Sequence, residues 1–222
     1  MGITAEQLAN LYPFVYHMAE DGSWDNIRQR GLMSTSALLD LFEIKGERRF
    51  AIESQHRPGS VRLEHPNYGT VVIRDQKPMR ESSLRKCLVD ISPQEWYELL
   101  NSRVFFWATE QRLLRLLSAR EYRNRTHCVL KIDTAELLGQ YSNSLSLSPI
   151  NSGSTIYKPQ PRGRQTFRRM EDYPFAERKK KRGVANAIAE MCIEHSVPNL
   201  AEFVMRAYQM TGNQVGDVLF ER

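Results

Sequence analysis

The chain has 222 residues, of which 41% are hydrophobic, and a formal net charge of +5 at pH 7. This length and composition suit one sizeable hydrophobic core, so we expect a single domain over residues 1–222. No run approaches the roughly eighteen apolar residues of a membrane span, and the N-terminus has no signal-peptide pattern. We therefore expect a soluble, cytoplasmic protein without a membrane partner.

The cysteines exclude two further classes of protein. Cys87, Cys128 and Cys192 are odd in number and far apart, and no second Cys or His stands at ligand spacing. This pattern argues against a disulfide framework and against a zinc site. We expect no metal and a reducing compartment.

The first predicted elements are a strand from Phe14 to Met18 and a short helix that follows it. Ser23 is a suitable N-cap for the helix, and Gly31 is a suitable stop. His17 thus lies near the end of a strand, just before a tight helix. A lone histidine in such a place is more often a hydrogen-bonded structural residue than a ligand-binding group.

The middle of the chain mixes helices and strands without a regular alternation, which predicts an α+β fold. Ser92 to Glu95 form a capping box with Pro93 at the first helical position, a strong helix start. Residues 142–165 are rich in Ser, Asn, Gly and Pro and are predicted to form a long loop. The other predicted elements are a helix from Ser34 to Phe42, a strand from Thr70 to Arg74, an aromatic strand from Asn101 to Ala108, a helix after Thr109, a strand from His127 to Ile132, and a helix from Asp133 to Gly139.

Residues 187–198 form a strand-like stretch with a carboxylate, Glu190, at its centre. Side chains alternate between the faces of a strand, so Met191 and Ile193 point away from Glu190. Burying an unpaired charge is costly, so Glu190 has a cation beside it, faces a water-filled cleft or serves a ligand. The alternative is an edge strand whose polar face lies in solvent.

Arg74 has two interpretations of equal weight. A guanidinium makes paired hydrogen bonds to phosphate oxygens, so Arg74 could hold a diphosphate. Alternatively, it forms a salt bridge with the adjacent Asp75 or another acid.

The order of these motifs resembles that of the ADP-ribosyltransferase fold, in particular the DarT-type DNA-modifying enzymes and the related RNA 2'-phosphotransferases. His17 on the opening strand, the aromatic strand, and Ala189-Glu190 followed by Val197-Pro198 carry the resemblance, which spans about residues 12–205. It implies a split antiparallel or mixed sheet core with flanking helices, NAD as co-substrate and no metal. Glu190 would then be catalytic, and His17, Arg74, Phe106 and Trp107 would bind NAD. The family's tyrosine on the second strand is replaced by Phe105, Phe106 and Trp107, so the ring that stacks on nicotinamide is left open.

Positive charge is concentrated between Lys158 and Arg182, where ten Lys or Arg face three acids, a local net charge of +7. Interleaved aromatic residues favour nucleic acid as the partner of this stretch, and the alternative is a solvated loop. We expect a basic loop region at about residues 142–183 that holds the acceptor beside Glu190. The predicted nucleic-acid contacts are Arg162, Arg164, Arg168, Arg169, Arg178, Lys179, Lys180, Lys181 and Arg182.

The sequence therefore predicts an NAD-dependent mono-ADP-ribosyltransferase that modifies nucleic acid, DNA or RNA. The resemblance also implies a toxin or phage-defence role and an antitoxin or immunity protein as a partner. Two alternatives stay open: an RNA 2'-phosphotransferase-like enzyme, and a non-catalytic nucleic-acid-binding module in which Glu190 is structural.

Overall fold

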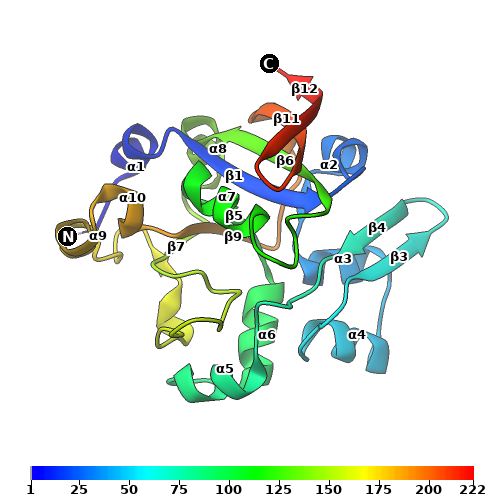
Figure 1. The fold of residues 1–222 in the computed structure, drawn as a ribbon, viewed down its shortest axis with the longest axis horizontal. Helices are drawn as coiled ribbons and strands as arrows, with labels where there is room; N and C mark the ends of the chain where they lie inside the picture. The colour runs from blue at the N-terminus through cyan, green and yellow to red at the C-terminus, as the bar shows by residue number, and fades with distance from the viewer. Residues whose placement is uncertain (1) are drawn as a thin grey trace.

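An eight-stranded antiparallel sheet is the largest element of the protein, and a computed structural model describes residues 2–222 (Figure 1). Two short ladders accompany it, β2 (Leu32–Met33) with β10 (Ser196–Val197) and the hairpin of β3 (Val61–His65) and β4 (Gly69–Ile73). Across the large sheet the strands are, in order, β12 (Gln214–Glu221), β11 (Val204–Thr211), β6 (Thr126–Asp133), β1 (Phe14–Glu20), β5 (Arg103–Trp107), β9 (Glu190–Glu194), β7 (Leu145–Ser148) and β8 (Arg168–Arg169).

Helices surround the sheet and complete a mixed α+β fold, as predicted. In Figure 1, α1, α9 and α10 lie at one end of the molecule, and α3, α4 and the β3–β4 hairpin lie at the other. None of the helices within residues 2–222 combines the length and the apolar character that crossing a lipid bilayer requires. The helices are α1 (Ala5–Leu11), α2 (Trp24–Arg30), α3 (Thr35–Leu41), α4 (Gly46–Glu53), α5 (Glu81–Cys87), α6 (Pro93–Asn101), α7 (Glu110–Leu117), α8 (Thr134–Tyr141), α9 (Phe175–Arg182) and α10 (Val184–Ala187), with 3-10 turns at Arg164–Thr166 and Leu200–Glu202.

Local sequence signals explain where several helices begin and end. In the capping box of α6, the Ser92 hydroxyl accepts a hydrogen bond from the Glu95 N–H at 3.2 Å, and the Glu95 carboxylate accepts one from the Ser92 N–H at 2.7 Å. The Ser34 hydroxyl caps α3 by accepting from the Ala37 N–H. Gly31 ends α2 with a φ of 77°, a left-handed conformation that glycine adopts without steric cost.

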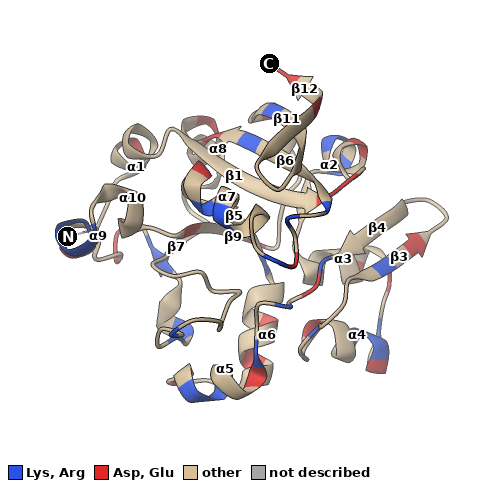
Figure 2. Ribbon diagram, in the orientation of Figure 1, with Lys and Arg blue, Asp and Glu red and all other residues tan. Residues whose placement is uncertain are grey.

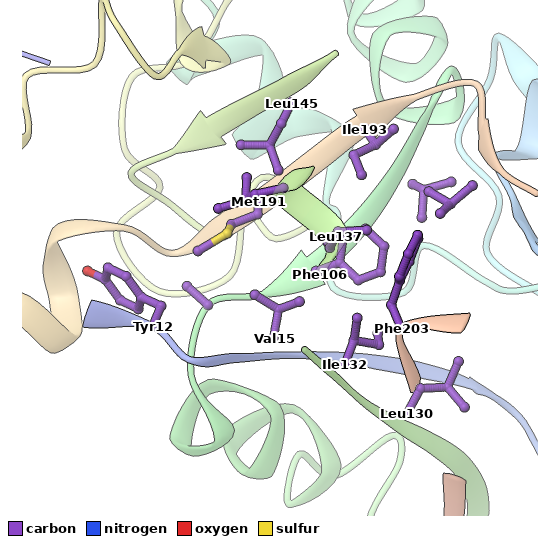
Figure 3. Packing of buried hydrophobic residues seen from close by; sticks show 14 of the residues in the cluster. Tyr12, Val15, Phe106, Leu130, Ile132, Leu137, Leu145, Met191, Ile193 and Phe203 are labelled. Atoms are coloured by element: carbon purple, nitrogen blue, oxygen red, sulfur yellow. The ribbon is translucent and has the colours of Figure 1, made fainter. Parts of the chain in front are cut away.

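The main core lies on one face of the sheet, where side chains of adjacent strands meet (Figure 3). Val15, Phe106, Leu130 and Met191 come from four different strands and are fully buried there. A second cluster, which includes Met18 and residues of α7, packs on the opposite face. Both faces of the central strands are therefore covered, and a polar side chain on them must face a cleft or a partner.

Three predicted boundaries were wrong. The 142–165 region is not one long loop, because Leu145 and Leu147 are buried and make β7 a strand paired with β9. The helix that Asp133 caps continues past Gly139 to Tyr141. The stretch 187–198 is not one strand: α10 ends at Ala187, and His195, with a φ of 64°, separates β9 from β10.

Candidate active site

A cleft of about 380 Å³ opens beside the centre of the sheet. Its walls come from β1, α2, α3, the β3–β4 hairpin, β5 and the turn Asn151–Gly153. The residues that matter most for its chemistry are His17, Arg74, Trp107, Ser152 and Glu190, all of which line it. We refer to this space as the cleft.

Glu190 is the first residue of β9 and lies between Trp107 of β5 and Ser148 of β7. Its strand is therefore an interior strand, and the edge-strand interpretation is wrong. Met191 and Ile193 point into the main core, as predicted from alternation, so Glu190 points to the cleft side. The residue is only 4% exposed.

The Glu190 carboxylate is held by a backbone group and has no salt bridge within residues 2–222. The Ser152 N–H donates to both carboxylate oxygens, at 3.1 and 3.2 Å. Burial raises the pKa of Glu190 to about 7, and the Ser152 hydrogen bonds and the charges of Arg112 and Arg162 oppose that rise. A carboxylate with a pKa near neutrality that faces a cleft is a candidate functional group.

His17 is half-buried on β1 and is fixed by the neighbouring strand. Its Nδ1 lies 2.8 Å from the Phe105 carbonyl oxygen. Burial lowers the pKa of His17 to about 4, despite the opposing effect of this hydrogen bond, so the ring is neutral near pH 7. Because a carbonyl only accepts, Nδ1 carries the proton and Nε2 is an acceptor. Such an acceptor suits a hydroxyl group of a ligand.

Arg74 extends from the end of β4 to the backbone of β1, where its Nη1 donates to the Met18 carbonyl oxygen at 3.3 Å. Its guanidinium carbon lies 5.0 Å from the centre of the Tyr122 ring. Burial lowers its pKa, and its buried Nε has no hydrogen-bond partner within residues 2–222.

The predicted alternative, a salt bridge between Arg74 and Asp75, does not form. The Asp75 carboxylate instead accepts from the Tyr122 hydroxyl at 3.0 Å and lies 3.9 Å from Arg125. Arg74 is thus a cation that lines the cleft and has no direct acidic partner in the described part of the chain.

The aromatic strand β5 divides its three rings between two faces. Phe105 and Trp107 line the cleft. Phe106 is 0% exposed and packs in the main core beside Val15, as Figure 3 shows. This placement corrects the expectation that Phe106 contacts a ligand, because adjacent residues of a strand point in opposite directions.

The predicted nucleic-acid contacts fall into three groups, and none of them lines the cleft. Arg162 is 3% exposed and Arg178 is half-buried, and both donate to backbone carbonyls. Arg164 begins the 3-10 turn Arg164–Thr166, and Arg168 and Arg169 form β8. The remaining four, Lys179 to Arg182, are on α9, at the end of the molecule away from the β3–β4 hairpin (Figure 2). The expected position beside Glu190 is therefore wrong for the residues on α9, whereas the charge of Arg162 does act on Glu190.

Sequence reasoning missed Ser152, the direct partner of Glu190, and Arg112, whose charge acts on it. It singled out Arg162 as a nucleic-acid contact and did not relate its charge to Glu190. Asn151-Ser152-Gly153 has the composition of an ordinary turn. Its contribution is a backbone N–H, which every residue except proline carries, so no side-chain pattern could identify it.

The structure describes no group of three or more His, Cys, Asp or Glu side chains in residues 2–222 that could hold a metal ion. Residues 13–204 match the model of a protein family whose description is a family of unknown function, DUF7002. The match covers His17, Arg74 and Glu190. No curated protein matches the chain.

Proposed function

The chain belongs to the DUF7002 family, and we propose that it is an NAD-dependent mono-ADP-ribosyltransferase with an ADP-ribosyltransferase-like fold. The observation that carries the proposal is the cleft-facing carboxylate of Glu190 on an interior strand, two strands away from His17. The motif order that resembles DarT-type enzymes joins residues from both ends of the chain, and these residues line one cleft.

Transfer breaks the bond between the nicotinamide nitrogen and ribose C1', and positive charge develops on the ribose. A fixed carboxylate stabilises that charge more in the transition state than in the ground state. Glu190 would accept a hydrogen bond from the ribose 2'-hydroxyl, and ionisation near pH 7 provides the required charge. Nicotinamide leaves with the electron pair of that bond, an acceptor nucleophile bonds to C1', and the proton of the nucleophile passes to solvent.

The other residues of the cleft fit the remaining parts of NAD. The unprotonated Nε2 of His17 suits the hydroxyls of the adenosine-side ribose. Phe105 and Trp107 supply aromatic surface for nicotinamide, and Arg74 supplies a half-buried cation for the diphosphate.

For the acceptor we propose nucleic acid. The support is the exposed basic cluster Lys179 to Arg182 on α9, together with the exposed Arg164 and the half-buried Arg168 near β8. Positive charge of this density favours a polyanion. A toxin or phage-defence role belongs to the same proposal.

The direct test is incubation of the purified protein with NAD labelled in its adenylate phosphate and separate pools of DNA, RNA and protein. We expect label in a nucleic-acid pool and release of nicotinamide. Glu190→Ala should lower the rate by about a hundredfold or more, because losing a preorganised charge contact costs about 3 kcal/mol.

Glu194→Ala is the matched control, since Glu194 lies on the same strand, is exposed and pairs with Arg103 at 2.9 Å. It should retain most of the activity. Equal activity in Glu190→Ala and the parent would exclude the proposed role. Label in the protein pool alone would exclude the nucleic-acid acceptor, and a cyclic phosphate product would favour the 2'-phosphotransferase alternative.

A further inference from the structure

We propose that Arg162 positions the Glu190 carboxylate by holding the Ser152 peptide in place, and so acts inside the site and not on a nucleic acid. This inference rests on the proposed function for its catalytic consequence. The contacts that support the inference are features of the fold and do not depend on any activity.

The first link is a hydrogen bond from the arginine to the turn. The Arg162 Nη1 donates to the Ser152 carbonyl oxygen at 2.9 Å, and its Nε donates to the Gln160 carbonyl oxygen at 3.2 Å. The guanidinium therefore ties two points of one loop together. Ser152 is 1% exposed, so this contact is shielded from water.

The second link runs from the turn to the carboxylate. The N–H of the same Ser152 donates to both oxygens of Glu190. Ser152 is thus held through its carbonyl by Arg162 and holds Glu190 through its N–H. A displacement of this turn would remove the only hydrogen bonds that the Glu190 side chain makes within residues 2–222.

Arg162 is itself fixed from three sides. Its guanidinium carbon lies 5.7 Å from the centre of the Trp96 ring, which is fully buried on α6. Its backbone N–H donates to the Cys87 carbonyl oxygen at 2.9 Å, and its own carbonyl accepts from the Val89 N–H at 3.0 Å. A side chain buried and fixed in this way cannot reach a polyanion, whereas it can position a neighbouring peptide.

Two cations and one thiol, from three elements, lie around Glu190. Arg162 from the loop and Arg112 from α7 favour the ionised carboxylate, and the thiol of Cys192 shares its strand. Removing Arg162 takes away one of the two cations and releases the Ser152 donor. Both changes disfavour the charged form of Glu190, so both raise the pKa of its carboxyl group.

The test measures the titration of Glu190 directly, by carboxyl ¹³C NMR of glutamate-labelled protein, with Glu190→Gln used to assign the resonance. Arg162→Met should raise the midpoint of the Glu190 titration by about one pH unit or more relative to the parent. Arg162→Lys keeps the charge, but one ammonium cannot copy both hydrogen bonds, so a smaller rise is expected. Arg85→Met is the matched control, because Arg85 is exposed and pairs with Glu81 on its own helix α5; it should leave the midpoint unchanged.

An unchanged midpoint in folded Arg162→Met would overturn the inference, and so would an equal shift in Arg85→Met. If Arg162→Met does not fold, Arg162→Lys decides in its place, and no shift there also overturns the inference. These outcomes need no turnover of NAD, so failure of the inference is distinct from failure of the proposed function. If the parent protein transfers ADP-ribose, kcat should fall in Arg162→Met, while KM for NAD changes little. The acid limb of the pH profile of kcat should also move to higher pH in this variant.

Discussion

At the residue scale, the cleft contains two titratable groups, the buried Glu190 and the half-buried His17, whose pKa values move in opposite directions. The pKa of Glu190 rises to about 7 and that of His17 falls to about 4, each chiefly because burial disfavours the charged form. Above pH 7, the site therefore holds an ionised acid and a neutral imidazole. This combination suits a ligand that is cationic at one point and offers hydroxyl groups at another.

The roles of His17 and Arg74 lead to a prediction about cofactor binding. Replacing either by Ala should weaken NAD affinity by about tenfold or more, since each loses one polar contact to a ligand worth about 1.5 kcal/mol. Arg28→Ala is the control, because Arg28 is an exposed residue of α2 that does not line the cleft. Calorimetric titration with NAD measures the effect. Unchanged affinity in both cleft variants would mean that NAD does not occupy this cleft.

At the element scale, the short β2–β10 ladder connects the two parts of the chain that carry the site. Leu32 pairs with Val197 and Met33 with Ser196. The helix after the His17 strand is thereby fixed to the segment after the Glu190 strand. Gly31 is at the closest point, since a Cβ there would lie 2.2 Å from the Val197 carbonyl oxygen.

Substitution of this glycine tests the ladder. Gly31→Ala should lower the free energy of unfolding by about 2 to 5 kcal/mol, from left-handed strain and from the clash with backbone. Gly22→Ala is the control, because Gly22 has a similar φ of 75° and nothing within 4 Å of its added Cβ. It should cost only about 1 kcal/mol. Urea unfolding measures both, and equal losses would show that the ladder does not restrict position 31.

The exposed face of α9 supports a prediction about the acceptor. Neutralising Lys179, Lys180, Lys181 and Arg182 together should weaken nucleic-acid binding and reduce its logarithmic salt slope by roughly 0.7 to 0.9 for each lost phosphate contact. NAD affinity should not change, because none of the four lines the cleft. Binding measured over a range of salt concentrations checks this. An unchanged slope would assign α9 a role in solubility alone.

Elements with a strong local signal could be predicted from the sequence. The Ser92 capping box, the helix stop at Gly31 and the alternation around Glu190 all depend on residues close together in the chain, and the structure contains each of them. The β7 strand was missed although Leu145-Ser146-Leu147-Ser148 alternates in polarity, because the surrounding Ser, Asn and Gly residues favoured a loop.

The surroundings of the site residues depend on tertiary contacts, and the sequence predicted them less well. Glu190, His17 and Trp107 line one cleft as expected. The contact of Ser152 with Glu190 joins positions 38 residues apart through a backbone N–H, so it has no sequence signature. Arg162 was assigned to a basic surface because local charge density does not reveal burial.

At the scale of the whole molecule, the two shifted groups affect stability with opposite signs. Glu190 has a raised pKa, so the folded state binds more protons than the unfolded state between about pH 4.5 and 7, and stability increases as pH falls through that window. His17 has a lowered pKa, so the folded state binds fewer protons between about pH 6.5 and 4, and stability decreases there as pH falls. In the parent protein these two contributions largely cancel.

Single substitutions should reveal each contribution. As pH rises from 4.5 to 7.5, the stability of Glu190→Gln relative to the parent should increase by about 3 kcal/mol, because only the parent loses the contribution of the raised pKa. One pKa unit corresponds to about 1.4 kcal/mol. Substitution of His17 by Gln should show the opposite trend, with a relative gain as pH falls below 6.5. Urea unfolding of the three proteins at several pH values measures the differences. Differences that do not vary with pH would show that these groups do not titrate as described.

The position of β9 between β5 and β7 has a consequence for the order in which the protein is assembled during synthesis. When the ribosome has made residues 1–182, β9 and β11 do not yet exist, and β5 and β6 each have one edge without a neighbour. His17 and Arg74 are then already present, but the carboxylate is not. The cleft therefore receives its carboxylate only from the late strand that also closes the sheet, and a nascent or truncated chain with open strand edges lacks the group on which the proposed chemistry depends.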